Sequence, residues 1–202
     1  MKLRNRWVVG VGIAAMALVG RQVFSQQEAH EMTEEEAKMM EAWAKAATPG
    51  EHHEHLKPLA GHFNATSRWR MSAEAEWGES NGTAEFTWIM DGRFLVQKVQ
   101  ADMDGQPFEG MGVMGFDNVT GKHYSAWWDS MGTGMMSSTG TCDASGKVVT
   151  YYGEYADPMT GQQKKSKSIH RVINNDKHVF EMYDRDENGK EFQSLEVTYT
   201  RR

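Results

Sequence analysis

Histidines near residue 50 offer the first chemistry that the residue types suggest. Of the 8 histidines, several lie close together in the sequence: His30, His52, His53, His55 and His62. On a helix, His52 and His55 would share a face, and imidazole is a ligand of Zn²⁺, Cu²⁺ and Ni²⁺. Glu51 and Glu54 are interleaved, and the HExxH pattern of zinc proteases is absent. A metal site at His52 and His55 therefore competes with a simpler interpretation, an exposed helix start.

Methionine is the most unusual feature of the composition, with 15 residues. A group of them falls in the middle of residues 61–202: Met111, Met114, Met131, Met135 and Met136. Clustered thioethers can bind Cu(I). Methionine also lines cavities for varied apolar ligands, because it is flexible and polarizable. It can equally fill gaps in a hydrophobic core, and the sequence leaves the three roles open.

Tryptophans with nearby charged residues form a third group. Trp127 and Trp128 are adjacent, so on a strand one of them must face inward. A buried indole N–H needs an acceptor, which Asp129 could supply from the same face as Trp127, unless Asp129 pairs with Arg93. This hydrogen bond could be structural or could line a cavity. The candidate ligand-binding residues are Trp88, Arg93, Met114, Asp117, Trp127 and Asp129.

Catalytic patterns are poor. Asp129, Ser130, His123 and His170 include the residue types of a hydrolase triad, but no G-x-S-x-G elbow is present. The run Gly110–Gly112 lies in a strand pattern without the helix that follows a phosphate-binding loop. We therefore name no catalytic residue, expect no enzyme activity and predict no cofactor.

The elements that must position these residues follow from a regular series of turn signals. Examples are Asn81-Gly82, Asp91-Gly92, Asp104-Gly105, Ser145-Gly146 and Asn188-Gly189. Such dipeptides favour the positive φ angles of tight hairpins. The segments between them predict strands near residues 62–71, 82–90, 93–102, 107–116, 122–130, 133–141, 147–156, 165–174, 178–185 and 190–200. Strands joined in this way form an antiparallel meander.

A flat meander of this length would expose two long edges, and closure into a barrel removes them. The predicted fold is therefore mainly β: an antiparallel up-and-down barrel of about ten strands, wide enough to hold a cavity. We assign it to residues 61–202.

A short helical extension, residues 26–60, is predicted before the barrel. Thr33 and Glu36 form a capping box, and behind it an apolar stripe repeats at helical spacing: Met40, Trp43, Ala44 and Ala47. Pro49-Gly50 ends this helix. A second helical stretch, Glu51 to Leu59, stops at Gly61.

Residues 1–25 have the pattern of a cleaved export signal. Basic residues precede the apolar stretch Trp7 to Gly20, which is short for a membrane span, and Val23 and Ser25 fit the small positions before a cleavage site. We expect cleavage after Ser25 and a periplasmic or extracellular protein that is not inserted in the membrane. An uncleaved anchor is the alternative.

Charge and cysteine content limit the partners. The formal charge is −6. It becomes −10 once residues 1–25 are removed, because they carry Lys2, Arg4, Arg6 and Arg21 and no acids. So acidic a protein repels nucleic acid and anionic lipid. Cys142 is the only cysteine, so no internal disulfide can form.

Six short motifs occur in order along the chain: His53-x-x-Leu56-x-x-Leu59-x-Gly61-x-Phe63, Met90-Asp91-Gly92-Arg93-Phe94-Leu95, Gly115-Phe116-Asp117, Trp127-x-Asp129-Ser130, Gly140-x-x-Asp143 and Tyr199-x-Arg201. As a set covering about residues 50–202, they resemble an uncharacterised family of secreted bacterial domains of unknown function, regarded as lipocalin-like. The resemblance implies a calycin-type barrel and export, and no established activity. Phe63 is a departure, because the family often has Trp there.

Three functions are consistent with these observations. The leading hypothesis is an exported, non-catalytic barrel that binds a small, mostly apolar molecule in its interior. A second is a structural or protein-interaction module of the cell envelope with a solid core. A third is binding of a metal or haem through His or Met. The sequence does not indicate an oligomeric state.

Overall fold

The computed structural model describes residues 32–103 and 105–202. The described elements are α1 (Glu34–Ala47), α2 (Glu51–Glu54), the 3-10 helix η1 (Lys57–Leu59), β1 (Gly61–Trp69), β2 (Gly78–Ile89), β3 (Phe94–Met103), β4 (Gln106–Asp117), β5 (Lys122–Asp129), β6 (Met136–Cys142), β7 (Val148–Ala156), β8 (Gln163–Asn174), β9 (Lys177–Arg185) and β10 (Glu191–Arg201). The predicted export signal lies outside the described residues.

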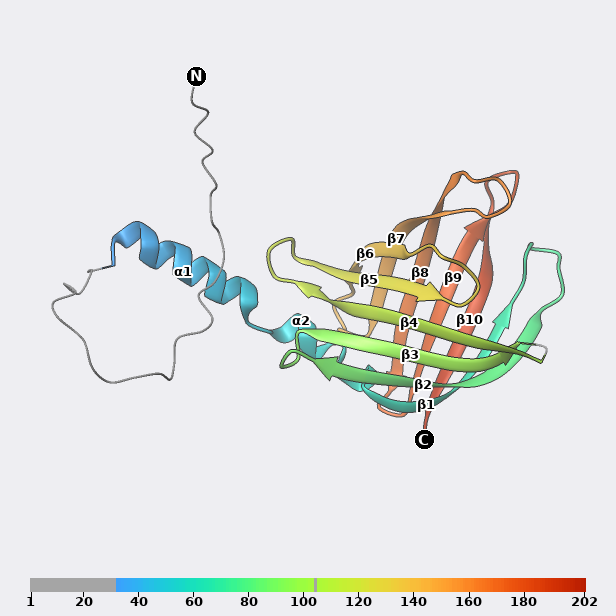
Figure 1. The fold of residues 1–202 in the computed structure, drawn as a ribbon, viewed down its shortest axis with the longest axis horizontal. Helices are drawn as coiled ribbons and strands as arrows, with labels where there is room; N and C mark the ends of the chain where they lie inside the picture. Colours follow the sequence, from blue (N-terminus) through green and yellow to red (C-terminus); the bar gives the residue numbers. More distant parts are fainter. Residues whose placement is uncertain (1–31, 104) are drawn as a thin grey trace, which may run out of the picture.

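The strands form one closed barrel (Figure 1). Each strand pairs antiparallel with its neighbour in sequence, and β1 also pairs with β10, with Phe63 opposite Arg201 and Trp69 opposite Leu195. Closure therefore gives every strand a partner on both sides. This confirms the predicted ten-stranded up-and-down barrel, and the strand bounds lie close to the predicted ranges.

Two of the connections are built by the same five-residue turn, D-x-x-T-G. The Asp117 carboxylate accepts hydrogen bonds from Val119 N (2.8 Å) and Thr120 Oγ1 (2.8 Å), and Gly121 N donates to the Asp117 carbonyl (2.8 Å). Residues 157–161 repeat these contacts at 2.9, 2.9 and 2.7 Å. Both turns end on glycine, at φ of +66° and +68°, where a side chain would be strained.

One turn signal was misleading. Asn81-Gly82 lies inside β2 and not between two strands. A Cβ at Gly82 would meet the Gln100 carbonyl oxygen at 2.3 Å, so the absence of a side chain lets β2 approach β3 closely. The glycine is therefore needed for strand packing and not for a hairpin.

The segment around α2 and η1 closes one end of the barrel. Leu56 and Leu59 are almost fully buried and pack in one cluster with Phe63, Phe86 and Leu95. Burying such side chains contributes about 1.5–3 kcal/mol each. This cluster is the hydrophobic core, and it lies at the end of the barrel where β1 begins.

Arg201 fastens the same segment to the last strand. Its Nη1 and Nη2 donate to the carbonyls of Ala60 and Pro58, both at 2.9 Å, and its Nε donates to the carbonyl of Asn175 at 2.8 Å. Its guanidinium also lies over the Phe63 ring, 4.6 Å from the centroid. The closing segment is therefore held by directed hydrogen bonds as well as by apolar packing.

The helix α1 projects away from the barrel (Figure 1). Its predicted capping box is present, with Glu36 N donating to Thr33 Oγ1 and Thr33 N donating to the Glu36 carboxylate. The expected apolar stripe is not covered by the described residues, since Trp43 is 71% exposed. The Asn118 amide donates to carbonyls in and just after the last helical turn and fixes the helix end. Among the described helices, none has the length and apolarity to cross a membrane.

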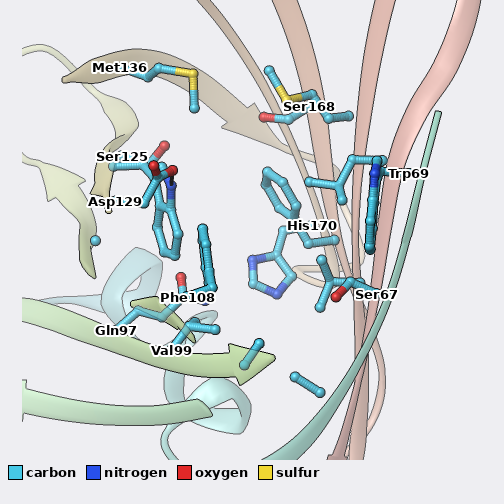
Figure 2. Close-up of a pocket in the computed structure, with 18 of the residues that line it drawn as sticks. Ser67, Trp69, Gln97, Val99, Phe108, Ser125, Asp129, Met136, Ser168 and His170 are labelled. Atoms are coloured by element: carbon cyan, nitrogen blue, oxygen red, sulfur yellow. Dashed lines mark hydrogen bonds between the residues drawn. The ribbon is translucent and has the colours of Figure 1, made fainter. Parts of the chain in front are cut away.

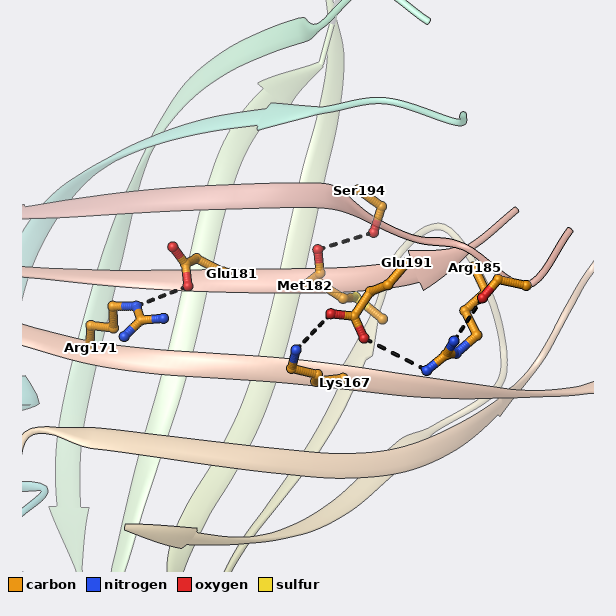
Figure 3. Close-up of polar contacts among 8 residues, drawn as sticks. Lys167, Arg171, Glu181, Met182, Arg185, Glu191 and Ser194 are labelled. Atoms are coloured by element: carbon orange, nitrogen blue, oxygen red, sulfur yellow. Dashed lines mark hydrogen bonds and ion pairs between the residues drawn. The ribbon is translucent and has the colours of Figure 1, made fainter. Parts of the chain in front are cut away.

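Ion pairs cross the outer face of β8, β9 and β10 (Figure 3). Lys167 pairs with Glu191 at 2.7 Å, Arg185 approaches the same carboxylate at 3.9 Å, and Arg171 pairs with Glu181 at 3.0 Å. Exposed pairs of this kind contribute at most about 1 kcal/mol each. They mark the solvent face of these strands, so the alternate residues face the interior.

Candidate functional site

The barrel encloses a cavity of about 380 Å³, lined by residues from all ten strands (Figure 2). It begins at Tyr199 and Met114, which belong to the core at the closed end, and extends to Trp69, Met103 and Met131 at the opposite strand ends. Met131 is exposed to solvent. The cavity therefore opens at the end away from α2. Its volume falls in the range of about 300–1,000 Å³ that is typical of small-molecule sites.

Aromatic rings and thioethers supply the apolar walls. The aromatic lining residues are Trp69, Phe108, Trp127, Tyr151, Phe180 and Tyr199, and the methionines are Met103, Met114, Met131, Met136 and Met182. Of the methionines singled out in the sequence, Met111 and Met135 are exposed and do not line the cavity. Because methionine is flexible, these walls can adjust to ligands of different shape.

Trp127 is held rigidly in the wall. Its Nε1 donates to Asp129 Oδ2 at 2.8 Å, and Asp129 Oδ1 accepts from Met131 N at 2.9 Å. Its ring lies against the neighbouring strand, where a Cβ on Gly110 or Gly112 would come within 2.3 or 2.9 Å of it. The predicted Trp127–Asp129 hydrogen bond is thus present. Both Asp129 carboxylate oxygens therefore accept hydrogen bonds from residues at the mouth of the cavity.

A buried polar network forms the floor. His170 Nε2 lies 2.9 Å from His178 Nδ1, and His178 stacks on Tyr199 with ring centroids 4.4 Å apart. The Tyr199 hydroxyl accepts from Gln97 Nε2 at 2.9 Å. Burial lowers the pKa of His170 to about 4, and burial, followed by repulsion from His170 and Arg201, lowers the pKa of His178. Both imidazoles are therefore neutral at pH 7.

The hydrogen bond between the two imidazoles fixes their tautomers. His178 Nε2 is buried and has no hydrogen-bond partner among the described residues. An orphaned acceptor is tolerated more easily than an orphaned N–H, so the proton of His178 lies on Nδ1 and is donated to His170 Nε2. A neutral His170 then carries its own proton on Nδ1. Since His170 lines the cavity, this tautomer gives the floor an imidazole N–H donor.

Hydroxyl groups complete the lining. Ser67 and Ser80 hydrogen-bond to each other at 3.1 Å, and Ser125 pairs with Ser138 at 2.8 Å. The Tyr151 ring lines the cavity, and burial raises the pKa of its phenol. The Tyr151 hydroxyl is buried and has no hydrogen-bond partner among the described residues. Four of the lining serines are thus paired with one another, and Ser137, Ser166 and Ser168 add further hydroxyl groups to the lining.

The structure brings together half of the candidate ligand-binding residues. Met114, Trp127 and Asp129 line the cavity. Trp88 packs against the core at the closed end, outside the lining. Arg93 and Asp117 lie in turns at that same end, beside the end of α1.

Both of these turn residues have structural partners. Arg93 donates to the Met90 carbonyl at 2.9 Å and does not pair with Asp129. Hydrogen bonds from Val119 N and Thr120 lower the pKa of Asp117. His52 and His55 also lie at the closed end, close to His123.

Sequence reasoning missed His170 and the serines. The signal was present in the alternation Ser166, Ser168, His170 on β8, and in Ala65 and Ser67 on β1. Small side chains at successive inward positions leave space, whereas large ones fill it. A search for small residues at period two would therefore have found the cavity walls.

Fold and site together define a closed β-barrel protein with an internal, largely apolar cavity. The chain belongs to the family described as protein of unknown function DUF1579, whose profile matches residues 48–201. The resemblance found in the motifs is thus confirmed as one to a family of unknown function with a ten-stranded barrel. No curated protein matches the chain.

The solved structures that the chain is similar to are distant from it in sequence. The crystal structure of Rv2717c from M. tuberculosis is 15% identical with a TM-score of 0.57, over 77% of this chain and 99% of that one. A redesigned β-barrel, b11L5F_LGL, is 17% identical with a TM-score of 0.37, over 78% and 96% of the two chains. The barrel EF1p2_mFAP2b bound to DFHBI is 14% identical with a TM-score of 0.41, over 75% and 100%. The likeness to Rv2717c supports the fold alone.

Proposed function

We propose that the barrel binds a small, neutral, mostly apolar molecule that carries a hydrogen-bond acceptor. The observation that supports this most directly is the cavity of about 380 Å³, with aromatic and methionine walls and the His170 donor on its floor. Apolar contact would supply most of the affinity, and the His170 N–H would orient the ligand. An interaction module with a solid core would have no reason to keep such a space open.

The charge of the cavity restricts the ligand further. Among the described residues that line the cavity, Asp129 is the one acidic side chain, and it lies at the mouth with both oxygens engaged. No lysine or arginine is part of this described lining. A buried carboxylate ligand would therefore lack a counter-charge, which is costly. Ketones, esters and quinones fit the site better than fatty acids.

We also propose that the protein works outside the cytoplasm. This rests on the sequence of residues 1–25, with its basic start, apolar stretch and small residues before position 26. Mass spectrometry of protein from its native cell is expected to give Gln26 as the first residue. An intact N-terminus would contradict cleavage.

Titration with N-phenylnaphthylamine, a neutral apolar fluorophore, tests ligand binding. Its emission should rise on binding to the wild-type protein. Ser168→Leu places a larger side chain on a buried lining position of β8 and should weaken binding at least about tenfold, equivalent to about 1.4 kcal/mol.

Thr139→Leu on the exposed face of β6 is the matched control and should bind as the wild type does. Equal loss in both variants, or no binding by the wild type, would contradict the proposal.

A further inference from the structure

Three histidines from two separate elements meet beneath the floor of the barrel. His52 lies in α2, His55 follows directly after it, and His123 comes from the start of β5. One ring nitrogen from each lies within 4.8 Å of the others. Some 70 residues of chain separate His52 from His123. The tertiary fold, and not local chain geometry, therefore brings these side chains together. The sequence predicted His52 and His55 as a pair and gave no indication of the third.

His123 is a buried polar group without a partner. It is 1% exposed, and neither of its ring nitrogens has a hydrogen bond of acceptable geometry to the described residues. Nδ1 of His55 is also buried and has no hydrogen-bond partner among the described residues. Leaving such atoms unsatisfied destabilises the folded state. A bound ion would explain why several unsatisfied imidazole nitrogens lie in one cluster.

The surrounding residues hold the three rings in place. His52 stacks on Phe116 with ring centroids 4.2 Å apart. The His55 ring lies so close to Gly146 that a Cβ there would come within 2.8 Å of it. His53 is turned away from the group, because its Nδ1 accepts a hydrogen bond from Gly50 N at 3.1 Å. The cluster therefore consists of three imidazoles, not four.

We propose that His52, His55 and His123 bind a divalent transition-metal ion of the Zn²⁺, Ni²⁺ or Cu²⁺ class. Three imidazole ligands are the donor set that these ions prefer, whereas Ca²⁺ and Mg²⁺ require oxygen. Zn–N bonds of about 2.0–2.1 Å would draw the nitrogens to within about 3.4 Å of one another. His52 is exposed, so a small adjustment of its side chain can close that gap. The ion would tie the closing segment to β5.

Zn²⁺ titration of tag-free, EDTA-treated protein tests the site. We expect one bound ion per chain and a higher unfolding temperature in its presence. His52→Ala should weaken Zn²⁺ binding at least about tenfold, since losing even an outer-shell partner typically costs 10–100-fold. His62→Ala is the matched control, because His62 is an exposed histidine on β1 outside the cluster.

His123→Gln tests the buried ligand, and Co²⁺ gives an independent readout. Circular dichroism and N-phenylnaphthylamine binding first show that the variant is folded. If it is not, His55→Ala at the less buried position replaces it. Wild-type protein should give the visible absorption of tetrahedral Co²⁺, and the cluster variants should lose it.

Absence of binding by the wild type, or equal loss in His62→Ala, would overturn the proposal. The cavity lies on the other side of the floor, so loss of metal binding with normal fluorophore binding separates this inference from the proposed function.

Discussion

Buried polar atoms decide the chemistry of this barrel at the scale of single residues. The floor contains neutral imidazoles at His170 and His178, and the Tyr151 hydroxyl has no partner among the described residues. Each such atom costs free energy that apolar side chains would not. These buried polar groups can be removed one at a time to measure what each contributes to stability.

Tyr151→Phe removes only the unpartnered hydroxyl. We expect the free energy of unfolding to rise by about 1 kcal/mol, because an unsatisfied buried group is replaced by an apolar one. Urea denaturation of the ligand-free protein measures this change. Tyr152→Phe is the control, since Tyr152 is 61% exposed, and it should have almost no effect. Destabilisation by Tyr151→Phe would mean that the hydroxyl has a partner.

Gly110→Ala tests how tightly the Trp127 ring is held. The added Cβ would lie 2.3 Å from Trp127 Cζ2, so the indole must move into the cavity or the strand must shift. Overpacking of this kind costs about 1–3 kcal/mol. Urea denaturation should show that loss, and the tryptophan emission should change. Gly132→Ala, in an open loop, should do neither, and equal effects would contradict the close packing.

The secondary-structure elements were largely predictable, and their orientation was not. Alternating side chains and Asp-Gly or Asn-Gly turns predict strands because both are local properties of the chain. Asn81-Gly82 misled because the same dipeptide also serves close strand packing. The predicted apolar stripe on α1 includes Trp43, which is exposed, because helical period indicates an apolar face and not what covers it.

Site residues were predictable only where the interaction is local. Trp127 and Asp129 are two apart on one strand, so period two placed them together. Arg93 and Asp117 were chosen for their charge, but they lie in turns at the closed end. Alternation predicts which face of a strand a residue occupies and not its height along the barrel. The cluster of His52, His55 and His123 depends on how α2 packs beneath β5, which no local pattern encodes.

At the scale of the whole molecule, one end of the barrel is sealed and the other is open. The sealed end contains the hydrophobic core and the Arg201 hydrogen bonds, so most of the stability resides there. The open end contains the cavity, where side chains pack less completely and leave space for a ligand. A fall in pH should therefore lower the free energy of unfolding through the buried imidazoles that lie between the sealed end and the cavity.

Stability should fall as the pH drops from about 6.5 toward 4. The pKa of His170 is about 4 when folded and 6.5 in the reference state, so over this window the unfolded chain binds a proton that the folded one does not. The loss is about 1.4 kcal/mol per pH unit for this group. The neighbouring His178, whose pKa burial also lowers, and the buried His123 add to this loss.

Urea denaturation at pH 7 and pH 5 measures the effect. His170→Gln should reduce the slope, whereas His62→Gln, at an exposed position, should leave it unchanged. An unchanged slope in His170→Gln would show that this imidazole is not buried as a neutral group.

The most direct test of the central claim is the side-chain ¹⁵N–¹H NMR spectrum of His170 during titration with a neutral aromatic ketone and with a hydrocarbon of the same shape. Both ligands should shift resonances of cavity residues, and only the ketone should shift the Nδ1–H signal of His170. Shifts confined to the outer face of the barrel, or binding of neither ligand, would contradict the claim that this cavity holds an apolar molecule with a hydrogen bond from His170 at its floor.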